Sequence, residues 1–308
     1  MHRTLEITVA PTATDQLLQE LVGLDEVIGV AVSRGASHKP VGDVITVHAL
    51  NRDTDEVLKC VRLAEADGPI SVVTAEVASI IDPAKQERID NDVDEAIWEE
   101  METGLRHQGR VTVNFLTLMA LGGAIATVGL LSEPVPQVTA FIAASIIAPG
   151  FEPLVKIPLG LVLRRGNVVQ RGLVSAGLGY LVLIGAATLV FLLLRVSGAV
   201  TVTQLTHNPE VERLAHPSSL DLLVSACGVV AGLTMIAAYR RSVIAGALIA
   251  TVLIPAAALV GAAIAAGEGG LIVSGLKRLA IDAAFLLVLG SGVFFIKQST
   301  VHHRAPLV

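Results

Sequence analysis

The sequence predicts a mainly α-helical membrane protein that begins with a small α+β domain. The chain of 308 residues is 53% hydrophobic and only 16% charged, and its mean hydropathy is +0.69. After residue 110, apolar runs of about 20 residues recur, which is the length needed to cross a bilayer. The first 82 residues instead carry short strand and helix patterns. We therefore expect four parts: a cytosolic domain at 1–82, an acidic linker helix at 83–110, a transmembrane domain at 111–298 and a cytosolic tail at 299–308.

The first domain reads as four strands and two helices in the order β-α-β-β-α-β, the order of a ferredoxin-like split unit. The strands are expected at 3–10, 27–34, 43–50 and 69–81, and the helices at 14–25 and 54–68. Thr14 or Asp15 would cap the first helix, and a loop with Gly35, Pro40 and Gly42 would join the middle strands. The apolar helix faces are expected to be Leu17, Leu18, Leu21 and Val22, then Val57, Leu58, Val61 and Leu63. Because this fold hosts many functions, the domain either binds a ligand or partner or packs without one.

Residues 83–110 are expected to form one connecting helix. Its apolar stripe recurs every four residues, at Ile89, Val93, Ile97, Met101 and Leu105. The other face is acidic and comprises Asp90, Asp92, Asp94, Glu95, Glu99, Glu100 and Glu102. We interpret this face as solvated; at the entrance of a pore it would instead concentrate cations.

Six membrane spans are expected, at 112–131, 138–163, 172–194, 220–239, 243–266 and 279–296. Basic clusters at 106–110, 164–171, 240–241 and 297–304 fall on one side of these spans. Since cytoplasmic loops carry the excess of Lys and Arg, both termini are placed in the cytoplasm. Lys277 and Arg278 fall on the other side and weaken this rule slightly.

The second span is interrupted midway by Pro149, Gly150, Pro153 and Pro158. Prolines remove backbone donors and force the chain off a regular helix. Lipid offers no hydrogen-bond partners, so such a break persists at membrane depth only where protein or a water-filled cavity surrounds it. We therefore expect this segment to lie inside a helix bundle and to mark the working site.

The six spans divide into two halves of three, which must have opposite orientations. The middle span of each half places a run rich in small residues before a proline, as IAASIIAPGFEPLV and GALIATVLIPAAALV. This similarity predicts an inverted-topology repeat in which the second and fifth helices are both broken, at Pro149 and Pro255. Chance similarity between two short segments of low complexity is the alternative.

The motifs ASIIAPGFEPL and GALIATVLIPAAALVG resemble the two hydrophobic signatures of a bacterial membrane family catalogued as domain of unknown function 389. The resemblance covers roughly residues 114–296, and members of the family often carry a small N-terminal domain. The family pattern favours methionine, leucine and paired prolines. This chain has Ile146, Ile147 and Phe151 in the first motif and only Pro255 in the second. The resemblance implies this architecture and a bacterial cytoplasmic (inner) membrane, and it implies no particular chemistry.

Ionisable and polar residues inside the spans are the candidates for a transport path or binding site, because such groups are costly in a membrane. The candidates are Asn114, Ser145, Pro149, Gly150, Glu152, Pro153, Lys156, Thr251, Pro255 and Asp282. Glu152 and Lys156 are four residues apart and would pair on a helix, or they would reach the interface as anchors. Asp282 follows Arg278 by four residues, which predicts a structural ion pair. Small residues at helix-packing spacing are Gly228 with Gly232 and Ser175 with Gly179.

No nucleophile elbow, phosphate loop, dinucleotide fingerprint or HExxH motif is present in the sequence, so we expect no enzyme. We also expect no metal, no cofactor and no nucleic-acid partner. The expected partners are the lipid bilayer, a small solute or ion, and further copies of the chain in a homo-oligomer. The first hypothesis is a transporter or channel in which Glu152 binds a cation or proton and the N-terminal domain regulates. The second is a non-transporting sensor or scaffold whose cytosolic domain binds a ligand or partner.

Overall fold

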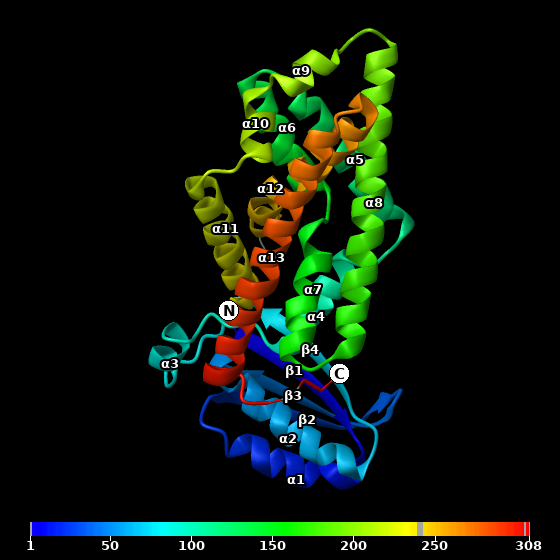
Figure 1. The fold of residues 1–308 in the computed structure, drawn as a ribbon. Coiled ribbons are helices and arrows are strands. Elements are labelled where there is room, and N and C mark those ends of the chain that lie inside the picture. The colour runs from blue at the N-terminus through cyan, green and yellow to red at the C-terminus, as the bar shows by residue number, and fades with distance from the viewer. Residues whose placement is uncertain (1, 239–242, 305, 308) are drawn as a thin grey trace. The chain divides into compact units, whose positions relative to one another are not determined.

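The structure is a computed structural model that describes residues 2–238, 243–304 and 306–307; the side chains of residues 67 and 243–251 also lie outside the described part. The chain forms two compact units. The N-terminal unit comprises Met1–Glu100 together with Lys297–Val308, and the membrane unit comprises Met101–Ile296. Figure 1 follows the chain from one terminus to the other.

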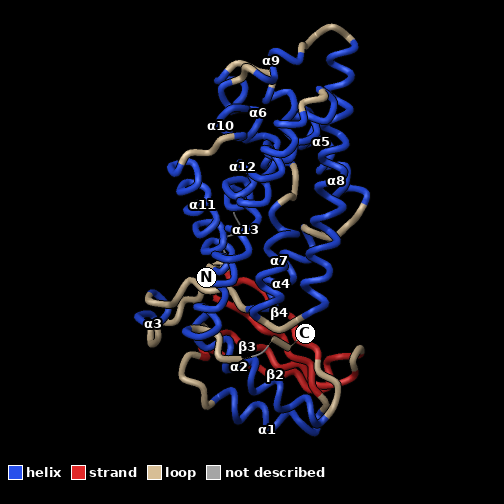
Figure 2. The backbone as a smooth tube through the Cα atoms, in the orientation of Figure 1, coloured by secondary structure: helices blue, strands red, loops and turns tan. Residues whose placement is uncertain are grey.

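The N-terminal unit contains one four-stranded antiparallel sheet. Its elements are β1 (His2–Val9), α1 (Pro11–Val22), β2 (Val27–His38), β3 (Val41–Ala49), α2 (Thr54–Ala64) and β4 (Ser71–Val77). The predicted order of strands and helices is confirmed. The strands lie in the order β2-β3-β1-β4, so each helix connects two strands that are not neighbours. Figure 2 shows both helices on one face of the sheet.

The core of this unit lies between the sheet and the two helices. Strand β1 alternates, with Leu5, Ile7 and Val9 buried, as expected for a sheet covered on one side. The helix residues in the core are Leu17, Leu21, Val57, Leu58 and Val61. The prediction was wrong for Val22 and Leu63, which are 66% and 69% exposed.

Two local predictions for this unit were wrong. Helix α1 begins at Pro11 after Ala10, so neither Thr14 nor Asp15 caps it. The hydroxyl of Thr14 instead donates to Asp43 Oδ2 at 2.7 Å. The expected loop at Gly35 is part of β2, because Gly35 N donates to Asp43 Oδ1 at 2.7 Å and its φ of +66° suits glycine.

The linker is not one helix. It forms α3 (Gln86–Asp90) and α4 (Trp98–Gln108), and residues 92–97 between them have no regular secondary structure. The physical reason is a set of contacts with the strand-to-helix turn at Asn51. The backbone N–H of Asn51 donates to Asp92 Oδ2 at 2.8 Å, and its side-chain amide donates to Val93 O at 2.6 Å. These bonds offer the backbone an alternative to the helix.

The acidic residues of the linker are not simply solvated. Glu95 pairs with Lys297, Glu99 with Arg304, and Glu100 with Arg3. The interpretation of this face as solvated was therefore wrong for these three carboxylates. They join segments that are distant in the sequence.

The C-terminal tail is not free either. His302 Nδ1 and Arg304 Nε both lie 2.6 Å from the carboxylate of Asp55. Arg304 also donates two hydrogen bonds to Glu99, at 2.6 and 2.7 Å. Leu307 packs against the apolar core of the sheet. The tail is thus a structural part of the N-terminal unit.

The membrane unit is helical. Its helices are α5 (Val113–Leu130), α6 (Pro134–Ile147), α7 (Phe151–Val162), α8 (Gly166–Val196), α9 (Val202–Thr206), α10 (Pro209–Ala215), α11 (Ser219–Ala237), α12 (Val243–Ala266) and α13 (Gly269–Thr300). Among the described residues, α5, α8, α11 and α13 are long and apolar enough to cross a membrane, and α6 with α7 make a bent fifth candidate. The prediction of membrane-length apolar helices is confirmed. The polar loop expected at 195–219 contains the short helices α9 and α10.

Helix α12 lies at the centre of this unit, in contact with α5, α6, α7, α8 and α11. Every residue from 253 to 263 is buried. Helix α12 continues through Pro255, so the predicted break in the fifth helix was wrong. A single proline removes one hydrogen bond, and neighbouring helices tolerate this inside a membrane bundle. The second span, which does break, has Pro149 and Pro153 close together with Gly150 between them.

Candidate functional site

The predicted break in the second span is confirmed. Helix α6 ends at Ile147, α7 begins at Phe151, and the two axes are bent by 52°. Ala148 has extended backbone angles (φ −82°, ψ 118°), because Pro149 follows it and disfavours the helical region. The N–H of Gly150 donates to Ala148 O at 2.7 Å. The break therefore follows from local backbone chemistry.

The break is enclosed by protein. All residues of α7 from 151 to 160 are buried. A Cβ added at Gly150 would lie 2.7 Å from Ile254 Cδ1 of α12 and 3.2 Å from the Tyr180 hydroxyl of α8. That hydroxyl donates to Gly150 O at 3.2 Å. The enclosure meets the requirement that irregular backbone at membrane depth be sheltered from lipid.

Glu152 brings a carboxylate to this break. It lies in the first turn of α7 and is 9% exposed, and its Oε2 atom has no hydrogen-bond partner among the described residues. The positive end of the helix dipole favours a negative charge at this position. Ser145, in the last turn of α6, also has a buried hydroxyl without a partner in the described part of the chain. Each side of the break thus carries one buried side-chain oxygen that accepts no hydrogen bond from the described residues.

The pairing expected between Glu152 and Lys156 is not formed, since no ion pair between described residues joins them. Lys156 is buried, and its Nζ atom donates to Gly109 O at 2.7 Å. A Cβ added at Gly109 would lie 2.8 Å from Nζ and 3.1 Å from the backbone nitrogen of Pro153, so the chain approaches α7 closely here. Lys156 is therefore held in place by the chain that follows α4.

Of the remaining candidates, some lie away from the break, and one side chain lies outside the residues that the structure describes. Pro153 is buried in the first turn of α7. Asn114 is exposed in the first turn of α5. Pro255 lies within α12, and the side chain of Thr251 falls outside the described residues. The structure thus gathers Ser145, Pro149, Gly150, Glu152 and Pro153 at the break.

A second charged centre connects α13 with α11. Arg278 Nε donates to Asp282 Oδ2 at 2.8 Å, and its NH2 group donates to Ser225 Oγ at 2.7 Å. Both charged side chains are almost fully buried, and Asp282 Oδ1 has no partner among the described residues. The predicted ion pair between Arg278 and Asp282 is confirmed.

The small residues singled out for packing lie on α8 and α11. Ser175 and Gly179 are buried, and a Cβ added at Gly179 would lie 2.9 Å from Phe115 Cζ of α5. On α11, Gly232 is buried and Gly228 is half-buried.

Sequence reasoning did not identify Tyr180, although a signal was present. A tyrosine inside an otherwise apolar span needs a hydrogen-bond partner for its hydroxyl. A carbonyl oxygen at a proline break is such a partner, and the structure shows Gly150 O in this role.

The apolar helices and the sheltered break define a multi-pass helical membrane protein. The family model described as Domain of unknown function (DUF389) matches residues 145–288, which confirms the resemblance of the motifs to that family over this segment. The matched segment begins at Ser145 and includes the break, α12 and the Arg278–Asp282 pair. No curated protein and no solved structure matches the chain. Among the described residues, no group of three or more His, Cys, Asp or Glu side chains is arranged to hold a metal ion.

Proposed function

We propose that the protein is a transporter or channel for a small polar solute or ion. The observation that carries the proposal is the broken span, whose ends meet inside the protein beside the buried carboxylate of Glu152. A broken helix leaves backbone N–H and C=O groups at its two ends without intrahelical partners. Transporters commonly use such helix ends, near the middle of the membrane, to bind substrates and ions.

In this proposal Glu152 binds the cation or proton. A carboxylate at membrane depth is costly and is retained where it serves a function or is paired. Glu152 has no ion-pair partner among the described residues, and one of its oxygens has no hydrogen-bond partner. Ser145 adds a hydroxyl oxygen from the other side of the break. Oxygen atoms of this kind suit a hard cation or a proton.

The layout we propose has six spans in two inverted halves, with α12 as the fifth span. The first half is α5, α6 with α7, and α8, and the second half is α11, α12 and α13. The contact between α6 and α12 supports this layout, because the middle spans of two inverted repeats meet at the substrate site. The basic clusters support cytoplasmic termini in a bacterial cytoplasmic membrane.

We assign the N-terminal unit to the ferredoxin-like class and propose that it regulates the spans. The element order and the strand order β2-β3-β1-β4 support the class. Regulation is supported by the binding of the C-terminal tail within this unit, through Arg304.

Flux in proteoliposomes tests the proposal. Full-length protein is reconstituted, and movement of protons, Na⁺ and K⁺ is followed with internal dyes under an imposed gradient. Glu152→Gln keeps the size of the side chain and removes its charge, so we expect it to abolish flux while the thermal unfolding temperature stays unchanged. Glu133→Gln, at the exposed start of α6, is the matched control and should retain flux. Unaltered flux in Glu152→Gln would show that the charge of Glu152 is not needed for transport.

The second candidate is a non-transporting sensor or scaffold. The observation that favours it is the Asp55–Arg304–Glu99 cluster, which binds the C-terminal tail to α2 and to the start of α4. Its test needs the full chain, because the unit includes the tail. A ligand that raises the unfolding temperature of a protein that moves none of the three ions would favour this candidate.

A further inference from the structure

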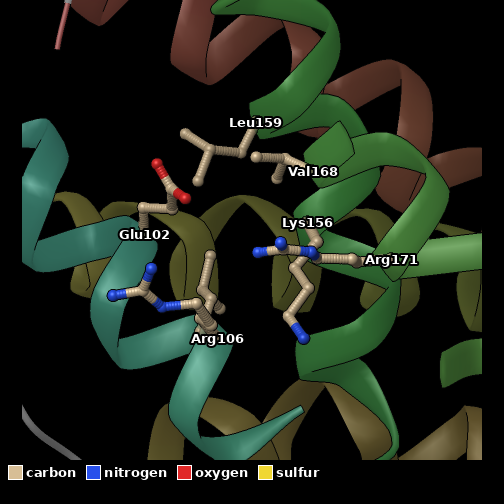
Figure 3. A pocket seen from close by; sticks show the side chains of 7 residues that line it. Glu102, Arg106, Lys156, Leu159, Val168 and Arg171 are labelled. Carbon is tan, nitrogen blue, oxygen red and sulfur yellow. The ribbon is translucent and has the colours of Figure 1, made fainter. Parts of the chain in front are cut away.

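The membrane unit has a small pocket between α4, α7 and α8. It is lined by Glu102, Leu105, Arg106, Lys156, Leu159, Val168 and Arg171. Figure 3 shows Glu102 and Arg106 on one side of the opening, and Lys156, Leu159, Val168 and Arg171 on the other. The pocket is separate from the break, since its α7 residues begin one turn after Glu152.

The pocket carries excess positive charge. Arg106, Lys156 and Arg171 are three cations in its lining. Its carboxylate, Glu102, is already engaged by Arg165 at 3.1 Å. Within the described part of the chain, no carboxylate forms an ion pair with any of the three lining cations. Their charge is therefore available to an anion.

Lys156 has donor capacity to spare. An ammonium group has three N–H donors. One of them is used by Gly109 O at 2.7 Å. The residue is buried, with 5% of its surface exposed. A buried cation with free donors beside two exposed arginines makes a site for an anionic oxygen, because charge-assisted hydrogen bonds are the strong ones.

The rest of the lining is apolar, and the pocket lies where the helices end. Leu105, Leu159 and Val168 supply aliphatic surface. Helix α7 ends at Val162 and α8 begins at Gly166. The space of about 10 Å³ holds one water-sized group, which suits one oxygen atom of a ligand. An amphipathic ligand with a phosphate at its head matches this lining.

We propose that this pocket binds the phosphate of an anionic phospholipid. Basic pockets between membrane helices are a known way to recognise such headgroups. Arg106 and Arg171 contact the phosphate from the two sides, Lys156 donates to the inward oxygen, and the aliphatic residues contact the glycerol and the first carbons of the chains. The lipid links α4 to α7, the second half of the broken span.

Native mass spectrometry of the full-length protein in detergent tests this proposal. The probes are phosphatidylglycerol, zwitterionic phosphatidylcholine and inorganic phosphate. The test variant is Arg106→Gln with Arg171→Gln. The matched control, Arg110→Gln with Arg164→Gln, removes two exposed arginines of the same region that do not line the pocket.

We expect phosphatidylglycerol to bind at least about tenfold more tightly than phosphatidylcholine. The test variant should lose about tenfold or more of that affinity, which is the loss of one strong charge-assisted hydrogen bond, and the control should lose less than about threefold. Equal losses in both variants would show that general surface charge attracts the lipid and would overturn the site. Displacement of the lipid by an equal concentration of inorganic phosphate would show a free-anion site and would overturn the lipid assignment.

Discussion

The hydroxyl of Tyr180 on α8 donates a hydrogen bond to the carbonyl oxygen of Gly150, at 3.2 Å, where the second span breaks. Both groups are buried, and Gly150 is the N-cap residue of α7, so the bond ties α8 directly to the backbone at the break. A helix neighbouring the break thus holds its backbone through an interhelical hydrogen bond.

Tyr180→Phe removes this donor and keeps the ring. We expect a loss of about 1 kcal/mol in the free energy of unfolding, since one buried interhelical hydrogen bond is lost and such bonds in membranes are of this size. Thermal unfolding in detergent measures the loss. Phe295→Leu, at a ring that is 65% exposed, is the control and should change stability little. If Tyr180→Phe is as stable as the wild type, the hydroxyl does not support the break.

The close contact between α8 and α12 depends on Gly261. An added Cβ there would lie 2.4 Å from Ile184 O, and Gly261 O also accepts a hydrogen bond from Thr188 Oγ1 at 3.0 Å. We expect Gly261→Ala to lower the free energy of unfolding by about 1–3 kcal/mol, because the backbone of α8 must shift.

Gly185→Ala is the matched control for this contact. It lies on α8 with no atom within 4 Å of the added Cβ. Alanine is the better helix former, so this variant should be as stable as the wild type or more stable. Thermal unfolding of the two variants side by side is the measurement. The same sign of change in both would contradict the close approach of the helices.

The sequence located the break in the second span because its cause is local. Pro149 acts on Ala148 through backbone sterics, and no distant residue is needed. The same reasoning failed at Pro255, where the burial of 253–263 keeps the helix continuous. The rule that proline disrupts a helix considers only neighbouring residues, so it does not account for the packing around α12.

Long-range partners account for most of the other errors. The linker leaves the helical conformation because Asp92 and Val93 bond to Asn51, which is about 40 positions earlier. Lys156 bonds to Gly109 O rather than to Glu152, which helix spacing suggested. The tail is held by Asp55, 249 positions before Arg304. None of these pairs repeats with the period of a helix or strand, so no pattern in the sequence indicates them.

The Arg278–Asp282 pair gives a test that separates structure from transport. Arg278→Met leaves Asp282 buried without its partner, so we expect a loss of about 3–5 kcal/mol. Arg278→Met with Asp282→Leu replaces both charges by apolar side chains and should recover most of that loss. A double-mutant cycle from thermal unfolding measures the coupling. The exposed pair Arg213–Glu210 serves as the control, with a coupling below about 1 kcal/mol.

The same double variant then reports on function. If it retains ion flux, Asp282 is a structural residue and is removed from the transport path. If it folds and loses flux while Glu133→Gln retains it, Asp282 takes part in transport.

The cluster of Asp55, Glu99 and Arg304 in the N-terminal unit predicts a specific pH dependence. Burial raises the pKa of Asp55, but hydrogen bonds from His302 and the charge of Arg304 outweigh burial and hold the pKa below its ordinary value of 3.8. Burial likewise raises the pKa of Glu99, and Arg304 outweighs it, so that this pKa lies below 4.5. A carboxylate with a lowered folded-state pKa stabilises the fold fully above the ordinary pKa. That stabilisation is lost as the pH falls through the lowered value.

Arg304→Gln therefore has an effect that depends on pH. Above about pH 4.5 we expect it to cost about 3–5 kcal/mol, because the buried Asp55 and the half-buried Glu99 both lose the guanidinium that pairs with them. Below that pH the difference from the wild type should narrow, since the carboxylates take up protons in both proteins. Lys59→Gln, which breaks an exposed pair with Glu56, should cost less than about 1 kcal/mol at every pH. Urea unfolding of the full chain from pH 3 to pH 7 measures both variants; a loss in Arg304→Gln that is the same at every pH would mean that packing, and not the charge of Arg304, holds the tail.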